Sequence, residues 1–392
     1  MDNIIIVIKS SQLCCLIVFL QLFFLSKSQY GGIGCDKNPL FIFGDSTISR
    51  GHDGKVTSFR ADYAPYGITR GNLNVSRFTN GYTFRDYLVE AMDLNKTGVL
   101  GDFDIARVFP GGGYNFAFGS AGILPQTGKA YGTTFGLDQQ IIMFRDALKD
   151  CYLNTPQNIS EEIVHCLMKA TFVIAVGTND YIESTVRPHL YNIHPNSTCD
   201  FAYALIQLLR KHLEDLYTWG ARKFLLFQIG PLDKYPVHSV MNSTADEIIQ
   251  QITTFNTELQ SMADELSDDL PDSFFYIVKT YLIINELIES NNEMPDKNND
   301  TDPCCEVKNG TLLCAPNGQF CEDTTTYLFW DALHLTEPAH SYLAKRYCDE
   351  KSVCSSSPIA FSYARAHSRP RPTYLAHCLI LLLTLLYFPP RL

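Results

Sequence analysis

The sequence predicts an α/β protein built on a single, doubly wound and mostly parallel sheet with helices on both faces. Four predominantly apolar runs of four to seven residues have the length and composition of buried strands. Three of these runs end at a glycine, which is typical of the turn that follows a strand. Helical patterns lie between the runs, and this alternation through one continuous stretch favours one sheet covered on both sides.

The expected elements follow one another along the chain. Strands are expected at 40–43, 172–176, 223–229 and 273–278. Helices are expected at 138–149, 200–218, 245–267 and 338–348. The clearest of them, at 245–267, places apolar residues three or four positions apart, which is the spacing of one helix face. Pro338 suits the first turn of the last helix, where a missing N–H costs little. Residues 291–326 are polar and contain cysteine and glycine, so we expect a long excursion tied by disulfides.

Composition excludes several classes of protein. Of the 392 residues, 46% are hydrophobic and 19% are charged, which is too apolar for a disordered chain. The formal net charge is −11 and Lys and Arg do not cluster, so nucleic acid is not an expected partner. We find no P-loop, dinucleotide fingerprint or metal-ligand pattern, and therefore expect neither a cofactor nor a metal.

Both ends of the chain have the pattern of targeting segments. Residues 12–25 form a short apolar run behind Lys9, so residues 1–28 are interpreted as a signal peptide, with an uncleaved anchor as the alternative. Residues 355–392 form a C-terminal tail with an apolar run at 374–388. The tail resembles a GPI-attachment signal, and a short tail helix is the plainer interpretation. Residues 29–354 are left as one domain.

Cysteines and glycosylation sequons agree with secretion. Ten cysteines lie between the two end segments, and an even number in a secreted chain indicates disulfides. Cys304, Cys305, Cys314 and Cys321 have no zinc-site spacing and are expected to be paired. The N-x-S/T sequons stand at Asn74, Asn95, Asn158, Asn196, Asn242, Asn299 and Asn309. The predicted location is extracellular, or at the cell surface if the tail directs GPI attachment.

Chemistry is expected where strands end, because ligands of such sheets bind beyond the carboxyl ends of the strands. Ser46 follows the first strand and Asn179 follows the second, while Asp331 and His334 stand near the end of the domain. A serine needs a base to become nucleophilic, and a carboxylate three residues before a histidine can orient that base. Ser120 lies in Phe118-Gly119-Ser120-Ala121-Gly122 but lacks the glycine two positions earlier that a nucleophile elbow requires.

The order of these motifs resembles the GDSL lipases and esterases of the SGNH hydrolases, most closely the plant-type branch. The resemblance covers roughly residues 38–350. It rests on the segments Phe41–Thr47, Tyr66–Ile68, Arg77–Gly81, Gly113–Gly122, Gly177–Tyr181 and Phe329–Glu337, with the paired Cys304-Cys305 before the last. It implies an SGNH/flavodoxin-like three-layer fold.

The resemblance also implies residue roles. Ser46 would be the nucleophile, His334 the general base and then acid, and Asp331 the carboxylate that orients it. The oxyanion would be held by the Ser46 backbone N–H, the Asn179 side chain and a backbone N–H of Gly119 or Ser120. The family usually has two adjacent glycines at the last position, so the Cβ of Ser120 is expected to narrow the acyl pocket or shift the loop.

The predicted function is that of a secreted serine carboxylic-ester hydrolase that acts through an acyl-enzyme. Two alternatives remain open at this point: an acyltransferase that uses an alcohol acceptor in the same site, and a non-catalytic binding or storage relative. The expected substrate is a small-molecule, lipid or carbohydrate ester. A membrane partner is expected only if the tail directs GPI attachment.

Overall fold

The computed structural model describes residues 38–51, 56–70, 77–92, 113–153, 159–191, 198–289, 302–308 and 311–351. The predicted signal peptide (1–28) and tail (355–392) lie outside the described residues. So do six of the seven sequon asparagines, Asn74, Asn95, Asn158, Asn196, Asn299 and Asn309. Asn242 is described and is exposed. None of the helices in the described ranges is both long and apolar enough to cross a membrane.

The sheet has five parallel strands in the order β2-β1-β3-β4-β5. They are β1 (Leu40–Gly44), β2 (Gly113–Asn115), β3 (Thr171–Ala175), β4 (Lys223–Phe227) and β5 (Phe274–Val278). This order is that of the flavodoxin-like doubly wound fold, in which the chain reverses direction across the sheet between β1 and β3. The predicted fold class is confirmed.

Four strands were expected from the sequence and β2 was not. Three residues, Gly-Tyr-Asn, carry too little periodicity to indicate a strand. The pairing with β1 creates it: Gly113 lies beside Leu40, at a φ of 99°. A Cβ on Gly113 would stand 1.8 Å from the Leu40 carbonyl oxygen, so only glycine permits this approach.

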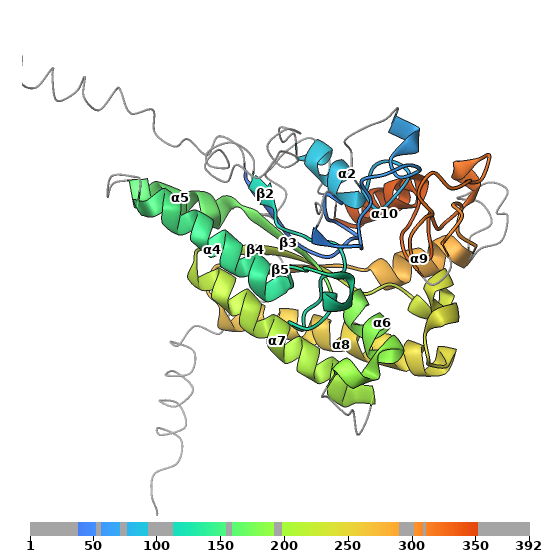
Figure 1. Ribbon diagram of the computed structural model, residues 1–392. Coiled ribbons are helices and arrows are strands. Elements are labelled where there is room, and N and C mark those ends of the chain that lie inside the picture. Colours follow the sequence, from blue (N-terminus) through green and yellow to red (C-terminus); the bar gives the residue numbers. More distant parts are fainter. Residues whose placement is uncertain are drawn as a thin grey trace, which may run out of the picture.

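Helices cover both faces of the sheet, as Figure 1 shows. The expected helices are α4 (Leu137–Leu153), α7 (Thr198–Thr218), α8 (Ala245–Asp269) and α10 (Glu337–Lys351), and these predictions are confirmed. Pro338 is the second residue of α10. Within the described ranges, four further helices were not expected: α2 (Phe84–Ala91), α5 (Ile159–Lys169), α6 (Thr178–Val186) and α9 (Thr280–Glu289). Most of these are short, and a short segment gives few turns over which to see a period.

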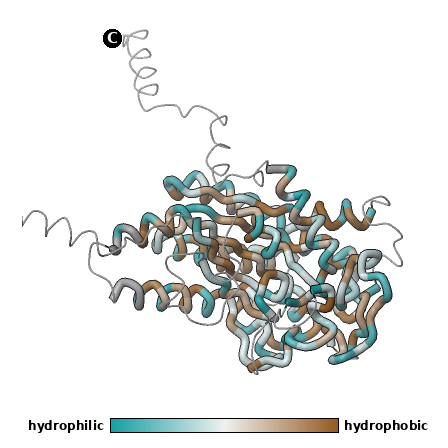
Figure 2. The backbone as a smooth tube through the Cα atoms, turned by 90° about the horizontal axis from the view of Figure 1, so that it is seen from above, coloured by the Kyte–Doolittle hydropathy of each residue, from teal (hydrophilic) through white to brown (hydrophobic). Residues whose placement is uncertain are grey.

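The two faces bury separate sets of side chains because alternate residues of a strand point in opposite directions. Phe41 and Phe43 of β1 pack in the core that includes α4, α5, α7 and α8. Leu40 and Ile42 pack in a second cluster with residues of α2, α9 and α10. Figure 2 shows hydrophobic segments of the backbone (brown) in the middle of the molecule. The sheet is therefore covered on both faces, and this packing fixes the positions and directions of its strand ends.

The excursion predicted at 291–326 is described at 302–308 and 311–326, and disulfides tie it together. Cys304 pairs with Cys321, and Cys305 pairs with Cys314. Two backbone hydrogen bonds, from the N–H groups of Cys304 and Cys305 to the carbonyls of Phe329 and Trp330, dock it beside the segment that carries Asp331. Cys166 and Cys348 each take part in a disulfide as well.

Candidate active site

The candidate site lies at the carboxyl ends of β1 and β3. Ser46 stands two residues beyond the end of β1, after Gly44, which has a φ of 145°. A Cβ on Gly44 would lie 2.0 Å from the carbonyl oxygen of Ala175 in β3. The side-chain amide of Gln140 braces the same point, because it accepts from the Gly44 N–H and donates to the Gly44 carbonyl, both at 2.8 Å. The turn that presents Ser46 is thus fixed by its neighbours.

Ser46, His334 and Asp331 form a continuous chain of hydrogen bonds. His334 Nε2 lies 2.7 Å from Ser46 Oγ. His334 Nδ1 lies 2.8 Å from Asp331 Oδ2 and 2.9 Å from Oδ1. All three residues are buried. The structure therefore brings together the nucleophile, base and carboxylate that the sequence predicts, although Ser46 and His334 are 288 positions apart.

The carboxylate of Asp331 is held in a defined orientation. Its Oδ1 accepts the backbone N–H groups of Leu333 at 2.8 Å and His334 at 2.7 Å. Its Oδ2 accepts the hydroxyl of Tyr66 at 2.7 Å. The local turn fixes one oxygen and a distant tyrosine fixes the other, so the imidazole meets a carboxylate that cannot rotate freely.

Asn179 is the second residue of α6 and is buried near the end of β3. Its Nδ2 donates to the backbone carbonyl of Ala121 at 2.9 Å, which ties it to the loop that carries Gly119 and Ser120. The amide group has a second N–H. The next residue, Asp180, strengthens this link by accepting the backbone N–H groups of Ile123 at 2.8 Å and Leu124 at 2.9 Å. Asp180 therefore holds the 123–127 loop, and its Oδ1 also accepts the hydroxyl of Thr127 at 2.7 Å.

Ser120 occupies a left-handed backbone conformation, with a φ of 60°, that favours glycine. Its side chain is completely buried, and its Oγ lies 3.2 Å from Thr134 Oγ1. The hydroxyl of Ser120 thus meets a threonine, whereas that of Ser46 meets an imidazole. Glycine adopts this conformation without strain, so the constraint at residue 120 is on its backbone.

Comparison with known proteins agrees with this geometry. A family model described as GDSL-like lipase/acylhydrolase matches residues 40–347. The chain belongs to this family. GDSL esterase/lipase 7 of Arabidopsis thaliana is 32% identical over 370 residues, which cover 90% of this chain and 98% of that protein. GDSL esterase/lipase At1g71250 of the same plant is 31% identical over 78% of this chain and 83% of its own length. Membership supports assignment of the chain as a carboxylic-ester hydrolase.

A solved α/β hydrolase from the metagenome of Lake Arreo, Spain, also aligns with this GDSL-family chain. The alignment has a TM-score of 0.36 and 10% identity, and it covers 83% of this chain and 100% of the other. A score this low carries no weight for the fold. The assignment of the fold rests on the strand order and on the uniformly parallel pairing.

Two sequence segments that resemble the plant-type GDSL pattern contribute groups whose role the sequence does not reveal. Tyr66 bonds Asp331, as described above. The ring of Phe78 lies against the His334 imidazole, with the ring centroids 4.8 Å apart. Asn80 accepts the backbone N–H of Glu337 at 2.7 Å and so holds the start of α10. The resemblance of both segments to the family pattern was the available signal in the sequence. Their contacts with the site depend on the fold.

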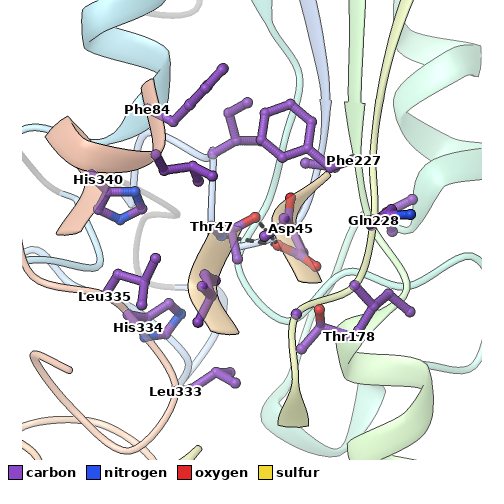
Figure 3. Close-up of a pocket in the computed structure, with 18 of the residues that line it drawn as sticks. Asp45, Thr47, Phe84, Thr178, Phe227, Gln228, Leu333, His334, Leu335 and His340 are labelled. Atoms are coloured by element: carbon purple, nitrogen blue, oxygen red, sulfur yellow. Dashed lines mark hydrogen bonds between the residues drawn. The ribbon is translucent and has the colours of Figure 1, made fainter. Parts of the chain in front are cut away.

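A small, largely apolar pocket of about 60 Å³ lies next to His334 (Figure 3). Its lining includes Asp45 and Thr47, the two neighbours of Ser46, and Leu333 and Leu335, the two neighbours of His334. His334 and His340 lie on one side of Asp45, with Gln228 and Thr178 on the other. The pocket therefore lies against the two segments that carry Ser46 and His334.

Burial shifts the pKa of two groups in this pocket in opposite senses. It raises the pKa of the Asp45 carboxyl to about 6, against the opposing effect of its hydrogen bonds from Thr47. It lowers the pKa of His340 to about 3, with the nearby His334 adding to the effect. Desolvation disfavours the charged form of each group, so both are held closer to neutrality than in water.

His340 is therefore expected to make this GDSL-family chain less stable in acid. Its pKa falls from 6.5 to about 3 on folding. Its contribution to the free energy of unfolding is therefore complete above pH 6.5 and is lost as the pH falls toward 3. The free energy of unfolding of His340→Leu should fall less between pH 7 and about pH 4.5, by roughly 2–3 kcal/mol, than that of the unsubstituted chain. Urea denaturation at the two pH values measures the difference, and parallel changes in the two chains would contradict it.

Proposed function

We propose that the chain is a secreted serine esterase in which Ser46 is acylated by the substrate. The observation that carries this proposal is the unbroken chain from Ser46 Oγ through the His334 imidazole to the Asp331 carboxylate. In such a hydrogen-bonded triad the carboxylate sets the tautomer of the imidazole, leaving Nε2 unprotonated and facing the hydroxyl. A serine that is otherwise a weak nucleophile gains a base at hydrogen-bond distance.

The proposed reaction proceeds in two halves. Ser46 Oγ forms a bond to the ester carbonyl carbon while its proton passes to His334 Nε2. The tetrahedral intermediate collapses, the bond to the alcohol oxygen breaks, and Nε2 returns the proton to that alcohol. Water then attacks the acyl-Ser46 ester and gives its proton to Nε2, which passes it back to Ser46 as the acid leaves. Asp331 keeps its charge throughout and stabilises the imidazolium in both halves.

The developing oxyanion is proposed to bind three N–H groups. These are the backbone N–H of Ser46, the side chain of Asn179, and a backbone N–H of Gly119 or Ser120. The bond from Asn179 Nδ2 to Ala121 O supports this set, because it uses one amide hydrogen to hold the 119–121 loop and leaves the other for the substrate. Fixed donors need no reorganisation when the charge develops, which is the source of their catalytic effect.

Fluorophosphonate labelling of the purified chain, with the adduct located by peptide mass spectrometry, tests the acyl-enzyme proposal. A single adduct on Ser46 that is lost in His334→Ala is the expected result. An adduct on another serine, or none on folded protein, would overturn it. Product analysis with and without added glycerol then separates transfer to water from transfer to an alcohol. N-terminal sequencing of protein recovered from the culture medium tests secretion, with a start near Gln29 expected.

Asn179→Ala is expected to lower kcat by roughly 10²–10³-fold with a much smaller change in KM, because an oxyanion donor acts mainly on the transition state. Steady-state kinetics on a p-nitrophenyl ester measures both constants. Asn256→Ala is the matched control: Asn256 is also buried and braces a strand end, through bonds of 2.9 Å to the N–H and carbonyl of Ile229. It should lose thermal stability but keep kcat within about fivefold. A near-normal kcat in Asn179→Ala would remove this residue from the oxyanion site.

A further inference from the structure

The hydroxyl of Tyr66 lies between the catalytic segment and the disulfide excursion. It donates to Asp331 Oδ2 at 2.7 Å and accepts the backbone N–H of Cys314 at 3.0 Å. Tyr66 is buried, and its ring packs edge-on against Tyr63 and Phe78. The position of the ring is therefore set by packing, and both polar contacts converge on one oxygen atom.

These two contacts fix the direction of the hydroxyl proton. A phenol has one proton to donate, and the Cys314 N–H occupies its oxygen as an acceptor. The proton is thereby directed to Asp331, and the N–H bond polarises the hydroxyl toward that carboxylate. Burial and the nearby charge of Asp331 raise the pKa of Tyr66 well above its ordinary value, so the hydroxyl stays protonated. Tyr66 is thus a permanent, oriented donor.

The bond from Tyr66 completes the hydrogen bonding of Asp331. Oδ1 accepts two backbone N–H groups from its own turn, and both oxygens lie within 2.9 Å of His334 Nδ1. Oδ2 also accepts the Tyr66 hydroxyl, which comes from outside that turn. Without the Tyr66 hydroxyl, Asp331 Oδ2 would have only the His334 imidazole as a partner, and more of its negative charge would act on that ring. The Tyr66 bond therefore affects both the orientation of Asp331 and the share of its charge that faces His334.

We propose that Tyr66 is a positioning residue for the hydrolytic reaction, and that the excursion sets its orientation through the Cys314 N–H. Cys314 is itself anchored by its disulfide to Cys305 and by the hydroxyl of Tyr63, which donates to the Cys314 carbonyl at 2.9 Å. Three hydrogen bonds thereby connect the excursion to the general base His334: Cys314 to Tyr66, Tyr66 to Asp331, and Asp331 to His334. The inference rests on the proposed function of these last two residues.

Tyr66→Phe and Tyr63→Phe form a matched pair for the test. Each removes one hydroxyl, keeps the ring, and breaks one bond to Cys314, but only the Tyr66 hydroxyl donates to Asp331. The Tyr63 hydroxyl lies beside that of Tyr66 and senses the charge of Asp331 without bonding it. Tyr66→Phe is expected to lower kcat roughly 10- to 100-fold with KM within about threefold, on the scale of a hydrogen bond to a charged group. Tyr63→Phe should leave kcat within about twofold. Equal losses in the two variants would reduce Tyr66 to a structural role.

The pH profile of kcat/KM gives a second readout. Among the described residues, the titratable groups that face His334 and Asp331 are Tyr63 and Tyr66, Asp45 after β1, and His340 of α10. Without the Tyr66 hydroxyl, more of the Asp331 charge faces the imidazole and favours its protonated form. The acid limb of the profile should move to higher pH in Tyr66→Phe and stay in place in Tyr63→Phe, since both variants keep Asp45 and His340. An unmoved limb would overturn the proposal.

Two controls separate the possible failures. If Tyr66→Phe melts well below the unsubstituted chain, the low-field proton resonance of His334 Nδ1–H, recorded below its melting temperature, replaces the kinetics: a shift relative to Tyr63→Phe is expected, and an unchanged resonance would overturn the proposal. Fluorophosphonate labelling of the unsubstituted chain tests the proposed function independently. Failure to label Ser46 there would defeat the serine mechanism, whereas normal labelling with an unaltered rate in Tyr66→Phe would defeat this inference alone.

Discussion

Ser46→Ala is expected to lower kcat on p-nitrophenyl esters by about 10⁴-fold or more. The substitution removes the hydroxyl that lies 2.7 Å from His334 Nε2, and with it the atom that would carry the acyl group. Reaction would then depend on direct attack by water on a substrate bound at the oxyanion donors, which retains only part of the acceleration. Because Ser46 is buried and loses only one oxygen, the melting temperature should change by a few degrees at most.

Ser120→Ala is the control for this experiment. Ser120 is also completely buried, and its hydroxyl bonds to Thr134. The variant keeps the backbone N–H of residue 120, so its kcat should stay within a few-fold of the unsubstituted value. A large loss in Ser120→Ala together with near-normal activity in Ser46→Ala would transfer the nucleophile to residue 120 and overturn the assignment.

Asp331→Asn is expected to lower kcat by about 10⁴-fold, the scale of the carboxylate-to-amide change in a serine triad. The surroundings dictate how the new amide is oriented. Two backbone N–H groups, from Leu333 and His334, point at Oδ1 and require an oxygen there, which places the NH₂ group at the Oδ2 position. That NH₂ group would donate to His334 Nδ1 and force the ring proton onto Nε2, where it faces Ser46. The imidazole could then no longer accept the serine proton.

A double variant checks whether these residues act together. Groups that act as one unit give strongly non-additive effects, so Ser46→Ala with Asp331→Asn should be no slower than Ser46→Ala alone. Steady-state kinetics of the three variants at one pH provides the comparison. If the two losses multiplied, Asp331 would have to act on some step other than the activation of Ser46.

Much of the fold was accessible to local reasoning. The runs at 40–43, 172–176 and 223–229 are apolar, short and followed by glycine, and they became β1, β3 and β4. The apolar stripe at 245–267 became α8, which a Thr244–Glu247 capping box begins. Ser46, Asn179, Asp331 and His334 were selected because their residue types and order resemble one family, and the fold brings Ser46, Asp331 and His334 into one hydrogen-bonded chain.

Other features had no local signal. β2 is a strand only because Gly113 lies beside Leu40, and Asp180 holds a loop more than fifty positions away. The pairing of Cys304 with Cys321 and of Cys305 with Cys314 was one of several that the sequence allows. The left-handed backbone at Ser120 follows from the loop around it and contradicts the usual preference of serine.

The sequence by itself therefore determined the strand and helix types of the longer elements and the parallel sheet, and it selected the residues that are proposed to act in catalysis. Only the tertiary structure decided that Tyr66, 265 positions from Asp331, is its hydrogen-bond donor, and that the disulfide excursion orients that donor. The physical reason is that some features depend on residues close in sequence and others on residues far apart. Periodicity and turn chemistry are set by neighbouring residues, whereas a hydrogen bond between distant segments exists only after the packed sheet has fixed where its strands end.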